Sequence, residues 1–304
     1  MARGNDEVMI QEELEKFATV ERDVSFTKMT TLRIGGLAKY VVYPENQYSL
    51  SGILNIAKEN HLPFKVFGKG SNILCSDEPY EGIIIRLDRH FNHFYFKDNL
   101  LVAEAGCSII ALAHEALKRS LSGLEFASGI PATVGGVTFM NAGAYKSSMS
   151  DVIHRVCVFI DGEIVWLRNE DCKFDYRKSV FQDHLDWIIL AVEIKLKPGN
   201  EEEIRELMEN RRQRRYDSQP LDKPSAGSIF RNPVNIPAWK LIEGIGYRGK
   251  RIGDAKVSEK HVNFLINDGN AKASDFLQLV EEIQEEVKKQ YGIDLYMEVE
   301  KFNW

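Results

Sequence analysis

The sequence has no long apolar run and no apolar segment at its N-terminus. The longest strictly apolar stretch, Trp187 to Val192, is about six residues, whereas roughly 20 are needed to cross a bilayer. Residues 1–17 are charged and contain no signal-peptide core. We therefore expect a cytoplasmic protein that neither spans a membrane nor is exported.

Cysteine is scarce and shows no pattern. The four cysteines, Cys75, Cys107, Cys157 and Cys172, form no CxxC pair and follow no regular spacing. A disulfide framework or a zinc site normally has such spacing. We interpret all four as reduced thiols that fill space as small hydrophobes, and we expect no metal site.

The chain also lacks an excess of basic residues. Its formal charge is −6, with 44% hydrophobic and 28% charged residues, which is typical of a soluble enzyme and argues against bulk binding to nucleic acid or anionic membranes. The basic run 211–215 follows several glutamates on one predicted helix. A salt-bridged helix face is favoured, with one or two arginines left as candidates for a ligand phosphate.

Periodicity predicts a mixture of helices and strands along 304 residues, enough for two or three domains. Helical patterns cover 8–18, 48–60, 108–119, 201–215 and 274–291, with Ser108 and Ser274 as N-caps and Gly292 as the end of the last helix. Strand patterns cover 39–43, 63–67, 82–87, 100–103, 155–160, 163–167, 187–196 and, by alternation, 293–299. Asp161-Gly162 predicts a hairpin.

Two glycine-rich segments are the most informative features. The uncharged segment Ser128–Val137 continues to Asn141–Tyr145, and an earlier loop, Gly68–Asn72, adds a cation with hydroxyl and amide groups. Glycine allows the main chain to approach a ligand closely, and such a loop can present several N–H groups to a phosphate. Together they predict a dinucleotide gripped by main chain at its pyrophosphate and its ring system.

Neither of the two commonest phosphate loops matches. A Walker A loop requires glycine five residues before Gly68, where Pro63 stands, and the third glycine of a Rossmann loop would fall on Ile73.

Four further features are candidates for a catalytic or binding role, and each also has a purely structural explanation. Ser228 could protonate a carbanion if positioned and desolvated, or be a loop serine; no nearby histidine or GxSxG motif indicates a hydrolytic triad. Arg177 could hold a carboxylate in a bidentate fork, or be surface charge. Glu298 is a candidate carboxyl group or a solvated edge residue. The basic stretch 248–261 suits an anionic substrate, such as a nucleotide diphosphate, or a charged loop.

Taken in order, six motifs resemble those of one family. The chain is similar, from about Thr31 to Val299, to the UDP-N-acetylenolpyruvoylglucosamine reductases (the MurB family) of bacterial peptidoglycan synthesis. The matching motifs are Thr31–Gly36, Gly68–Leu74, Gly129–Gly136, Asn141–Tyr145, Tyr176–Phe181 and Ala226–Phe230.

The resemblance implies an α+β protein with an FAD-binding fold of the vanillyl-alcohol-oxidase (PCMH) type. Residues 1–78 and 79–199 would be two FAD-binding subdomains, and 200–304 a substrate-binding domain whose last strand returns to the active site. NADPH would reduce non-covalently bound FAD and leave. The methylene carbon of the enolpyruvyl ether of UDP-N-acetylglucosamine would then receive the hydride. The protein would be a monomer without nucleic-acid or membrane partners.

The resemblance also assigns residues. Ser228 would protonate the enolate-like intermediate, which Arg177 and a protonated Glu298 would stabilise through the substrate carboxylate. Cofactor-binding residues would be Gly68, Lys69, Gly70, Ser71, Asn72, Ile73, Ser128, Gly129, Ile130, Pro131, Ala132, Thr133, Gly135, Gly136, Asn141, Gly143 and Ala144. Substrate-binding residues would be Tyr176, Arg231, Asn232, Lys240, Arg248 and His261.

The chain departs from the family pattern at two places. Some members carry an extra loop after the Tyr-Arg motif, whereas here Phe181 is soon followed by Trp187. This resembles the shorter, second-type members and leaves open which residue covers the UDP group. Members often have an arginine two positions after the glutamate, where this chain has Glu300.

Two other functions are considered. A flavin oxidase of the same fold would pass electrons to oxygen and often has a covalent flavin link, for which His114 and Cys107 are the nearest candidates, though neither lies in such a motif. A scaffold or nucleotide sensor would lack the serine, arginine and glutamate, all of which are present.

Overall fold

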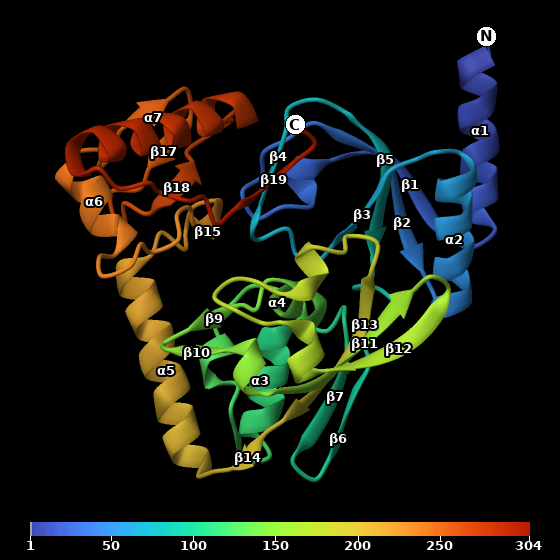
Figure 1. Ribbon diagram of the computed structural model, residues 1–304, viewed down its shortest axis with the longest axis horizontal. Coiled ribbons are helices and arrows are strands. Elements are labelled where there is room, and N and C mark those ends of the chain that lie inside the picture. Colours follow the sequence, from blue (N-terminus) through green and yellow to red (C-terminus); the bar gives the residue numbers. More distant parts are fainter. Residues whose placement is uncertain (1) are drawn as a thin grey trace. The chain divides into compact units, whose positions relative to one another are not determined.

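The computed structural model describes residues 2–304, with side chains from Glu7 onward. The chain forms two compact units (Figure 1). Unit 1 contains residues 1–22, 40–69 and 81–213, and unit 2 contains residues 23–39, 70–80 and 214–304. The predicted division at residues 78 and 199 into three domains stays a prediction.

Most of the chain's strands lie in unit 1. One four-stranded sheet has the order β1-β2-β5-β3, and a five-stranded antiparallel sheet has the order β12-β11-β13-β7-β6. The strands of these sheets are β1 (Ala18–Ser25), β2 (Leu37–Pro44), β3 (Phe64–Phe67), β5 (Tyr80–Arg86), β6 (Phe94–Lys97), β7 (Leu100–Glu104), β11 (Ile153–Ile160), β12 (Glu163–Arg168) and β13 (Ile188–Lys195). Two short ribbons pair β9 (Gly143–Ala144) with β10 (Ser147–Ser148) and β8 (Leu121–Ser122) with β14 (Lys197–Pro198).

The helices of unit 1 are held by caps and buried stripes. They are α1 (Ala2–Glu15), α2 (Gln47–Glu59), α3 (Ile109–Leu117), α4 (Val134–Phe139) and most of α5 (Glu201–Ser218). The Asn46 side chain caps α2 by accepting from Ser49 N, and Ser108 caps α3 as predicted. Leu50 and Ile53 of α2 are fully buried, as an amphipathic helix requires.

The predicted hairpin at Asp161-Gly162 is confirmed. Both residues have positive φ, 50° and 87°, and connect β11 with β12. This is the conformation of a two-residue turn whose twist matches that of its strands, and it explains why Asp-Gly was a strong signal.

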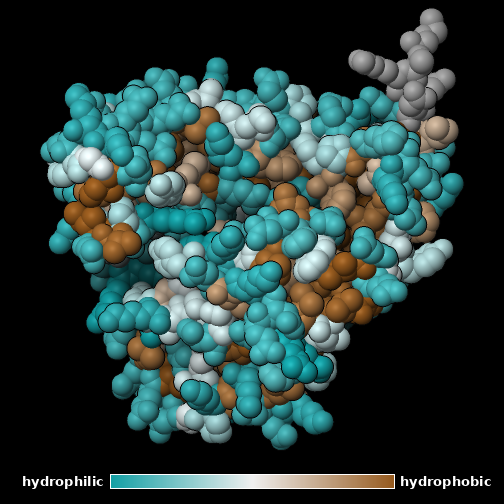
Figure 2. Space-filling view, in the orientation of Figure 1, coloured by the Kyte–Doolittle hydropathy of each residue, from teal (hydrophilic) through white to brown (hydrophobic). Residues whose placement is uncertain are grey.

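Unit 2 packs helices against a small sheet. The sheet has the order β15-β18-β17-β16, and a separate parallel ribbon joins β19 to β4. Its elements are β4 (Ile73–Cys75), β15 (Ser225–Ser228), α6 (Ala238–Gly244), β16 (Arg251–Ile252), β17 (Ala255–Val257), β18 (Phe264–Asn267), α7 (Ala273–Tyr291) and β19 (Glu300–Phe302). The predicted apolar stripe of α7 is buried at Phe276, Val280, Ile283 and Val287, whereas its outer face is hydrophilic in Figure 2.

The predicted strand over 293–299 is wrong. The regular strand β19 begins only at Glu300, and residues 293–299 make a single bridge, between Met297 and Phe230. The alternation reflected burial instead, since Leu295 and Val299 are buried while Tyr296 is exposed. An extended segment can alternate between core and solvent without a continuous neighbouring strand.

Ser274 does not cap α7, contrary to prediction. The helix begins at Ala273, and the carboxylate of Asp77 accepts hydrogen bonds from the main-chain N–H groups of Ala273 (2.8 Å) and Ser274 (3.0 Å). A residue almost 200 positions earlier therefore caps the helix, which no local pattern could reveal. Gly292 ends the helix with φ 68°, as predicted.

Two smaller boundary predictions are also wrong. Helix α1 ends at Glu15, and residues 18–25 form β1, so the predicted helix over 8–18 runs too far. The glycine segment, which shows no helical period, nevertheless contains the short helix α4.

The four cysteines form no disulfide among the described residues, and all four are buried, as predicted for small hydrophobes. Burial raises the pKa of Cys107 and Cys157 to about 11 and that of Cys172 to about 12. These three thiols therefore stay protonated near neutral pH and are poor nucleophiles. Within residues 2–304, no helix has the length and apolar character needed to span a membrane.

Candidate active site

The two glycine-rich segments meet in unit 1. A Cβ atom placed on Gly68 would lie 2.6 Å from Oγ1 of Thr133, so a side chain at position 68 would collide with the later segment. Thr133 is buried and accepts a hydrogen bond from Gly136 N, which caps α4. The end of strand β3 therefore lies directly against the start of α4. Gly68 allows this contact because it has no side chain to collide with Thr133.

The residues after Gly68 have unused main-chain donors. The N–H groups of Lys69, Gly70 and Ser71 donate to no acceptor among residues 2–304. Gly70 has φ 61°, and a Cβ atom there would lie 2.3 Å from the carbonyl oxygen of Met29. Several free N–H groups on a glycine turn are the donor set that a phosphate needs.

Arg177 lies at the tip of a strained turn in unit 1. Asp175 and Lys178 exchange two main-chain hydrogen bonds of 3.0 Å, and Arg177 between them has φ 55°. This left-handed conformation costs a residue with a side chain roughly 1–2 kcal/mol, whereas glycine adopts it without that cost. Its guanidinium Nη2 donates to the carbonyl oxygen of Gly143 at 2.7 Å. Such strain commonly marks a functional position.

Side chains from three places hold this turn. Asn141 Nδ2 donates to Asp175 O at 2.8 Å, and Gln182 Nε2 donates to the carbonyl oxygens of Arg177 (3.2 Å) and Phe139 (3.1 Å). The fully buried Ser179 donates to the same Phe139 oxygen at 2.6 Å. The end of α4 and the Arg177 turn are thus fixed to each other, and no sequence motif pointed to Gln182.

Ser228 ends strand β15 in unit 2. Gly227, with φ 78°, interrupts the pairing with β18 between Ser225 and Ser228, so that the ladder resumes at Ser228 opposite Phe264. Ser228 is half-buried, and its hydroxyl makes no hydrogen bond with the described part of the chain. A half-buried hydroxyl after an irregular glycine is available to a ligand.

Main-chain pairing brings Glu298 next to Ser228. Glu298 N donates to the carbonyl oxygen of Ile229 at 2.7 Å, and Arg231 N donates to Tyr296 O at 2.9 Å. Two predicted site residues that are 70 positions apart therefore belong to adjoining segments of one unit. Asn72, predicted to bind the cofactor, donates from Nδ2 to Glu298 O at 3.2 Å.

Asn263 fixes the residues that follow Ser228, and sequence reasoning missed it. Its side chain accepts from Phe230 N (3.0 Å) and donates to Phe230 O (2.9 Å), while its own carbonyl accepts from Ile229 N. Asn263 is only 4% exposed. A buried amide can hold a neighbouring backbone in this way, but a lone asparagine in sequence gives no signal of it.

The predicted substrate-binding residues have different surroundings. Tyr176 is half exposed, and the Nζ atom of Lys240 lies 5.7 Å from the ring centre of Trp239. Arg231 has a buried Nε without a partner in the described chain, whereas Asn232 Oδ1 accepts from Ala238 N at the start of α6. The Arg248 guanidinium binds Glu243 and the carbonyl oxygen of Glu259. The Glu243 hydrogen bond raises the pKa of Arg248.

The basic stretch 248–261 is largely neutralised locally. Besides Arg248, three of its cations bind carboxylates: Lys250 to Glu282, Arg251 to Asp254, and Lys256 to Glu259. These exposed pairs contribute little to stability. They do reduce the net positive charge with which this stretch could attract an anionic ligand.

His261 is held as a neutral ring. Burial lowers its pKa from 6.5, and Nδ1 accepts a hydrogen bond from Asn263 N at 3.2 Å. Its ring also meets Phe264 edge-on at 5.0 Å.

The buried His261 predicts a pH-dependent loss of stability. Below pH 6.5 the unfolded chain binds a proton that the folded chain resists, so the free energy of unfolding falls as the pH drops. H261N, which keeps an acceptor for Asn263 N, is expected to lose less stability than the parent between about pH 7.5 and about pH 5.5. Urea unfolding at the two pH values measures this. Equal losses would contradict the assignment.

Comparison with known families gives two matches that together cover much of the chain. Residues 38–168 match the FAD binding domain family. Residues 219–302 match the family described as the C-terminal domain of UDP-N-acetylenolpyruvoylglucosamine reductase.

Individual relatives are similar over most of their length. The chain is 41% identical to the UDP-N-acetylenolpyruvoylglucosamine reductase of Anoxybacillus flavithermus, covering 93% of this chain and 94% of the relative. It is 43% identical to that of Caldanaerobacter subterraneus subsp. tengcongensis, covering 89% of each. The crystal structure of the reductase (MurB) from Thermus caldophilus superimposes with a TM-score of 0.82 at 37% identity, covering 94% of this chain and 100% of that chain. The predicted α+β, FAD-binding fold class is confirmed.

Proposed function

We infer that the chain, which belongs to the UDP-N-acetylenolpyruvoylglucosamine reductase family, reduces the enolpyruvyl ether of UDP-N-acetylglucosamine to the lactyl ether of UDP-N-acetylmuramate. It is an FAD-containing oxidoreductase of peptidoglycan precursor synthesis. The observation that best supports this function is the order of the two family matches along the chain. The FAD-binding match spans both glycine-rich segments, and the reductase match spans Ser228 and Glu298.

The residues present fit an FAD dinucleotide. Gly68 leaves no room for a side chain beside Thr133, and the free N–H groups at 69–71 form a donor set for the pyrophosphate. We propose that these two segments hold the cofactor, with Gly129 and Gly136 allowing close approach of the ring system. When bound and reduced by NADPH, FAD supplies the hydride that the methylene carbon of the substrate receives.

Ser228 is the proposed proton donor. Hydride addition at the methylene carbon leaves a pair of electrons on the carbon that bears the carboxylate. The Ser228 hydroxyl gives its proton to that carbon, forming the lactyl C–H bond, and recovers a proton from solvent. The half-buried hydroxyl without a protein partner supports this role, since a general acid must face its substrate.

Arg177 and Glu298 are the proposed stabilisers of the enolate-like intermediate. The charge on the carbanion spreads into the substrate carboxylate, where a guanidinium fork can bind two oxygens and where the Glu298 carboxyl group is proposed to make a further contact. Positioned donors of this kind contribute roughly 3–4 kcal/mol each to the transition state. The strained, tightly held Arg177 turn supports a fixed role.

For the substrate's UDP group we favour Arg231 over Arg248 as a cation. Arg231 keeps a buried Nε without a protein partner in the described chain, whereas the Arg248 charge is already paired with Glu243. Tyr176, Asn232, Lys240 and His261 remain proposed contacts.

Anaerobic visible spectroscopy of the purified protein tests the function. We expect flavin absorption bands that bleach on adding NADPH and return on adding the enolpyruvyl sugar nucleotide. Bands that do not bleach with NADPH but bleach with a small alcohol or sugar would indicate a flavin oxidase. Absence of flavin bands, even after incubation with FAD, would overturn the cofactor assignment.

We also propose that the enzyme works in the cytoplasm as a monomer. The lack of a cysteine pattern supports the location. Light scattering during size-exclusion chromatography tests the monomer, for which the expected mass is 34.7 kDa plus that of one FAD.

A further inference from the structure

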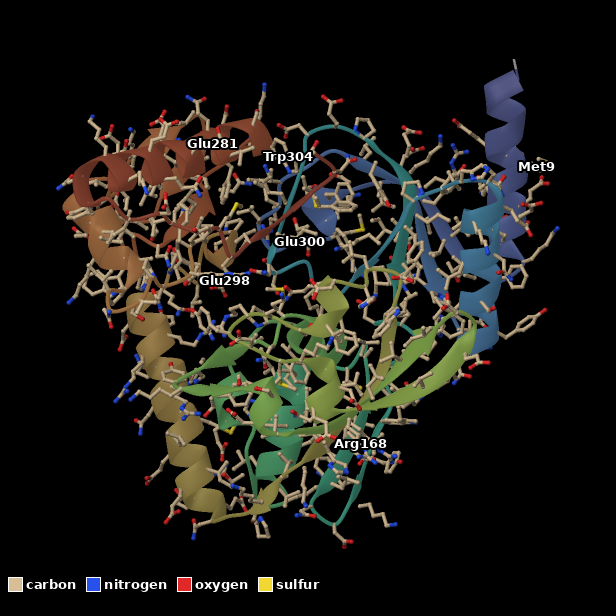
Figure 3. The ribbon with its side chains drawn as sticks, viewed as in Figure 1. Met9, Arg168, Glu281, Glu298, Glu300 and Trp304 are labelled. Atoms are coloured by element: carbon tan, nitrogen blue, oxygen red, sulfur yellow. The ribbon has the colours of Figure 1, made fainter. Side chains whose placement is uncertain are left out.

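We propose that the C-terminal segment Glu300–Trp304 positions Glu298 beside Ser228, and that Phe302 is the positioning residue through which it acts. The inference rests on the proposed function of Glu298. It adds a role to residues to which the proposed function assigns none. Figure 3 labels Glu298, Glu300 and Trp304 along this segment.

The segment is bound along its whole length to one stretch of unit 2. Strand β19 pairs in parallel with β4, aligning Glu300 with Ile73 and Phe302 with Cys75. Glu300 N donates to Asn72 O and Ser76 N donates to Phe302 O, each at 3.0 Å. A three-residue ribbon of two strands is marginal by itself in water, so side chains must hold it in place.

Side chains beyond the ribbon extend the attachment. Asn303 Nδ2 donates to the carbonyl oxygens of Glu78 (3.0 Å) and Pro79 (3.2 Å). Trp304 Nε1 donates to Leu74 O at 3.4 Å.

Phe302 supplies an aromatic contact. Its ring meets Phe26 edge-on at 5.8 Å and the Tyr80 ring at 4.8 Å between centres. Phe26 is fully buried and Tyr80 is 6% exposed, and burial raises the pKa of Tyr80. Aromatic clusters of this kind contribute both buried area and a preferred geometry. Removing the Phe302 ring would remove these two ring contacts with the buried side of the ribbon.

The peptide of Glu298 depends on this ribbon. Its N–H donates to Ile229 O at 2.7 Å, directly after Ser228, and its carbonyl accepts from Asn72 Nδ2 at 3.2 Å. Asn72 O then accepts from Glu300 N at 3.0 Å. Asn72 therefore binds the main chain on both sides of Val299, and one of these two hydrogen bonds is lost if Glu300 leaves the ribbon.

Loss of the Phe302 contact is expected to affect only one of the two half-reactions. Misplacement of a catalytic group by about 1 Å can lower a rate about 10²-fold. Glu298 acts on the substrate and not on NADPH, so its displacement should slow substrate reduction while leaving flavin reduction unchanged. A residue needed only for folding would lower the melting temperature and would slow neither half-reaction selectively at saturating FAD.

Stopped-flow absorbance at saturating FAD, below the melting temperature of each variant, tests the inference. In F302A we expect reoxidation of the reduced enzyme by substrate to slow about 10-fold to about 10²-fold, with the rate of bleaching by NADPH within about 3-fold of the parent. F302L should recover most of the loss. The matched control is K301A, which removes an exposed side chain from the same strand, with its Nζ 5.5 Å from the Trp304 ring centre, and leaves Phe302 and every main-chain hydrogen bond of the ribbon in place. It should therefore behave like the parent.

A double-mutant cycle separates positioning from a general effect. In an E298A background, F302A should slow reoxidation no further, because the group that Phe302 positions is already absent. Full additivity, or equal slowing of both half-reactions in F302A, would overturn the inference. If F302A does not fold, deletion of Asn303 and Trp304 should give a smaller loss in the same half-reaction, and an unchanged rate there would also overturn it. A parent enzyme that substrate fails to reoxidise would instead refute the proposed function.

Discussion

Replacing Ser228 with alanine is expected to slow reoxidation of the reduced enzyme by substrate about 10²-fold to about 10⁴-fold, the usual contribution of a general acid. Bleaching of the flavin by NADPH should stay close to the parent rate, since that step needs no proton on the substrate carbon. The two half-reactions are measured separately by anaerobic stopped-flow absorbance.

The matched control for this prediction lies on the same strand. S225A removes a hydroxyl from the other end of β15, whose main-chain carbonyl is bound by Thr31 Oγ1 at 2.7 Å. It should leave both rates near the parent values. If S228A slowed both half-reactions alike, Ser228 would be a structural residue and the proton would come from another group.

Replacing Arg177 with alanine is expected to slow reoxidation by substrate about 10²-fold to about 10³-fold, the typical loss when one oxyanion-stabilising donor is removed. R177K should recover only part of the rate, because an ammonium group cannot form the planar two-bond fork to a carboxylate. The Michaelis constant and the turnover rate are measured together, since loss of a transition-state contact lowers turnover more than it weakens binding.

Lys178, the next residue, provides the charge control. K178A removes the same charge from the same turn, where Lys178 lies 3.9 Å from Asp183, and should have little effect. An equal loss in K178A and R177A would mean that the overall positive potential matters and that no specific fork exists.

Features that depend only on residues close together in the chain could be predicted from the sequence. Asp161-Gly162 predicted its hairpin because few residue pairs adopt two consecutive positive φ angles. Helix α7 was clear from its stripe and from Gly292. The composition of the glycine loop at 68 and of the segment at 128 predicted that main chain approaches a dinucleotide closely. That stays a prediction; the structure shows that the two segments meet at Thr133.

Other features could not be predicted, because they depend on residues distant in sequence. The cap of α7 comes from Asp77, and the turn of Arg177 is held by Asn141 and Gln182. Asn263 fixes the backbone after Ser228. Each is an ordinary polar side chain whose importance arises from the buried main-chain group that it satisfies.

The sequence by itself determined the family, the α+β class and the types of chemical group available, because motifs and turn residues are constrained by their own backbone geometry. Only the tertiary structure decided which cations are already neutralised, as Lys250 is by Glu282, and which segments bring Glu298 next to Ser228. A charge or a carboxyl group gains its role from its partners and its burial, and these are set by the packing of segments that are far apart along the chain.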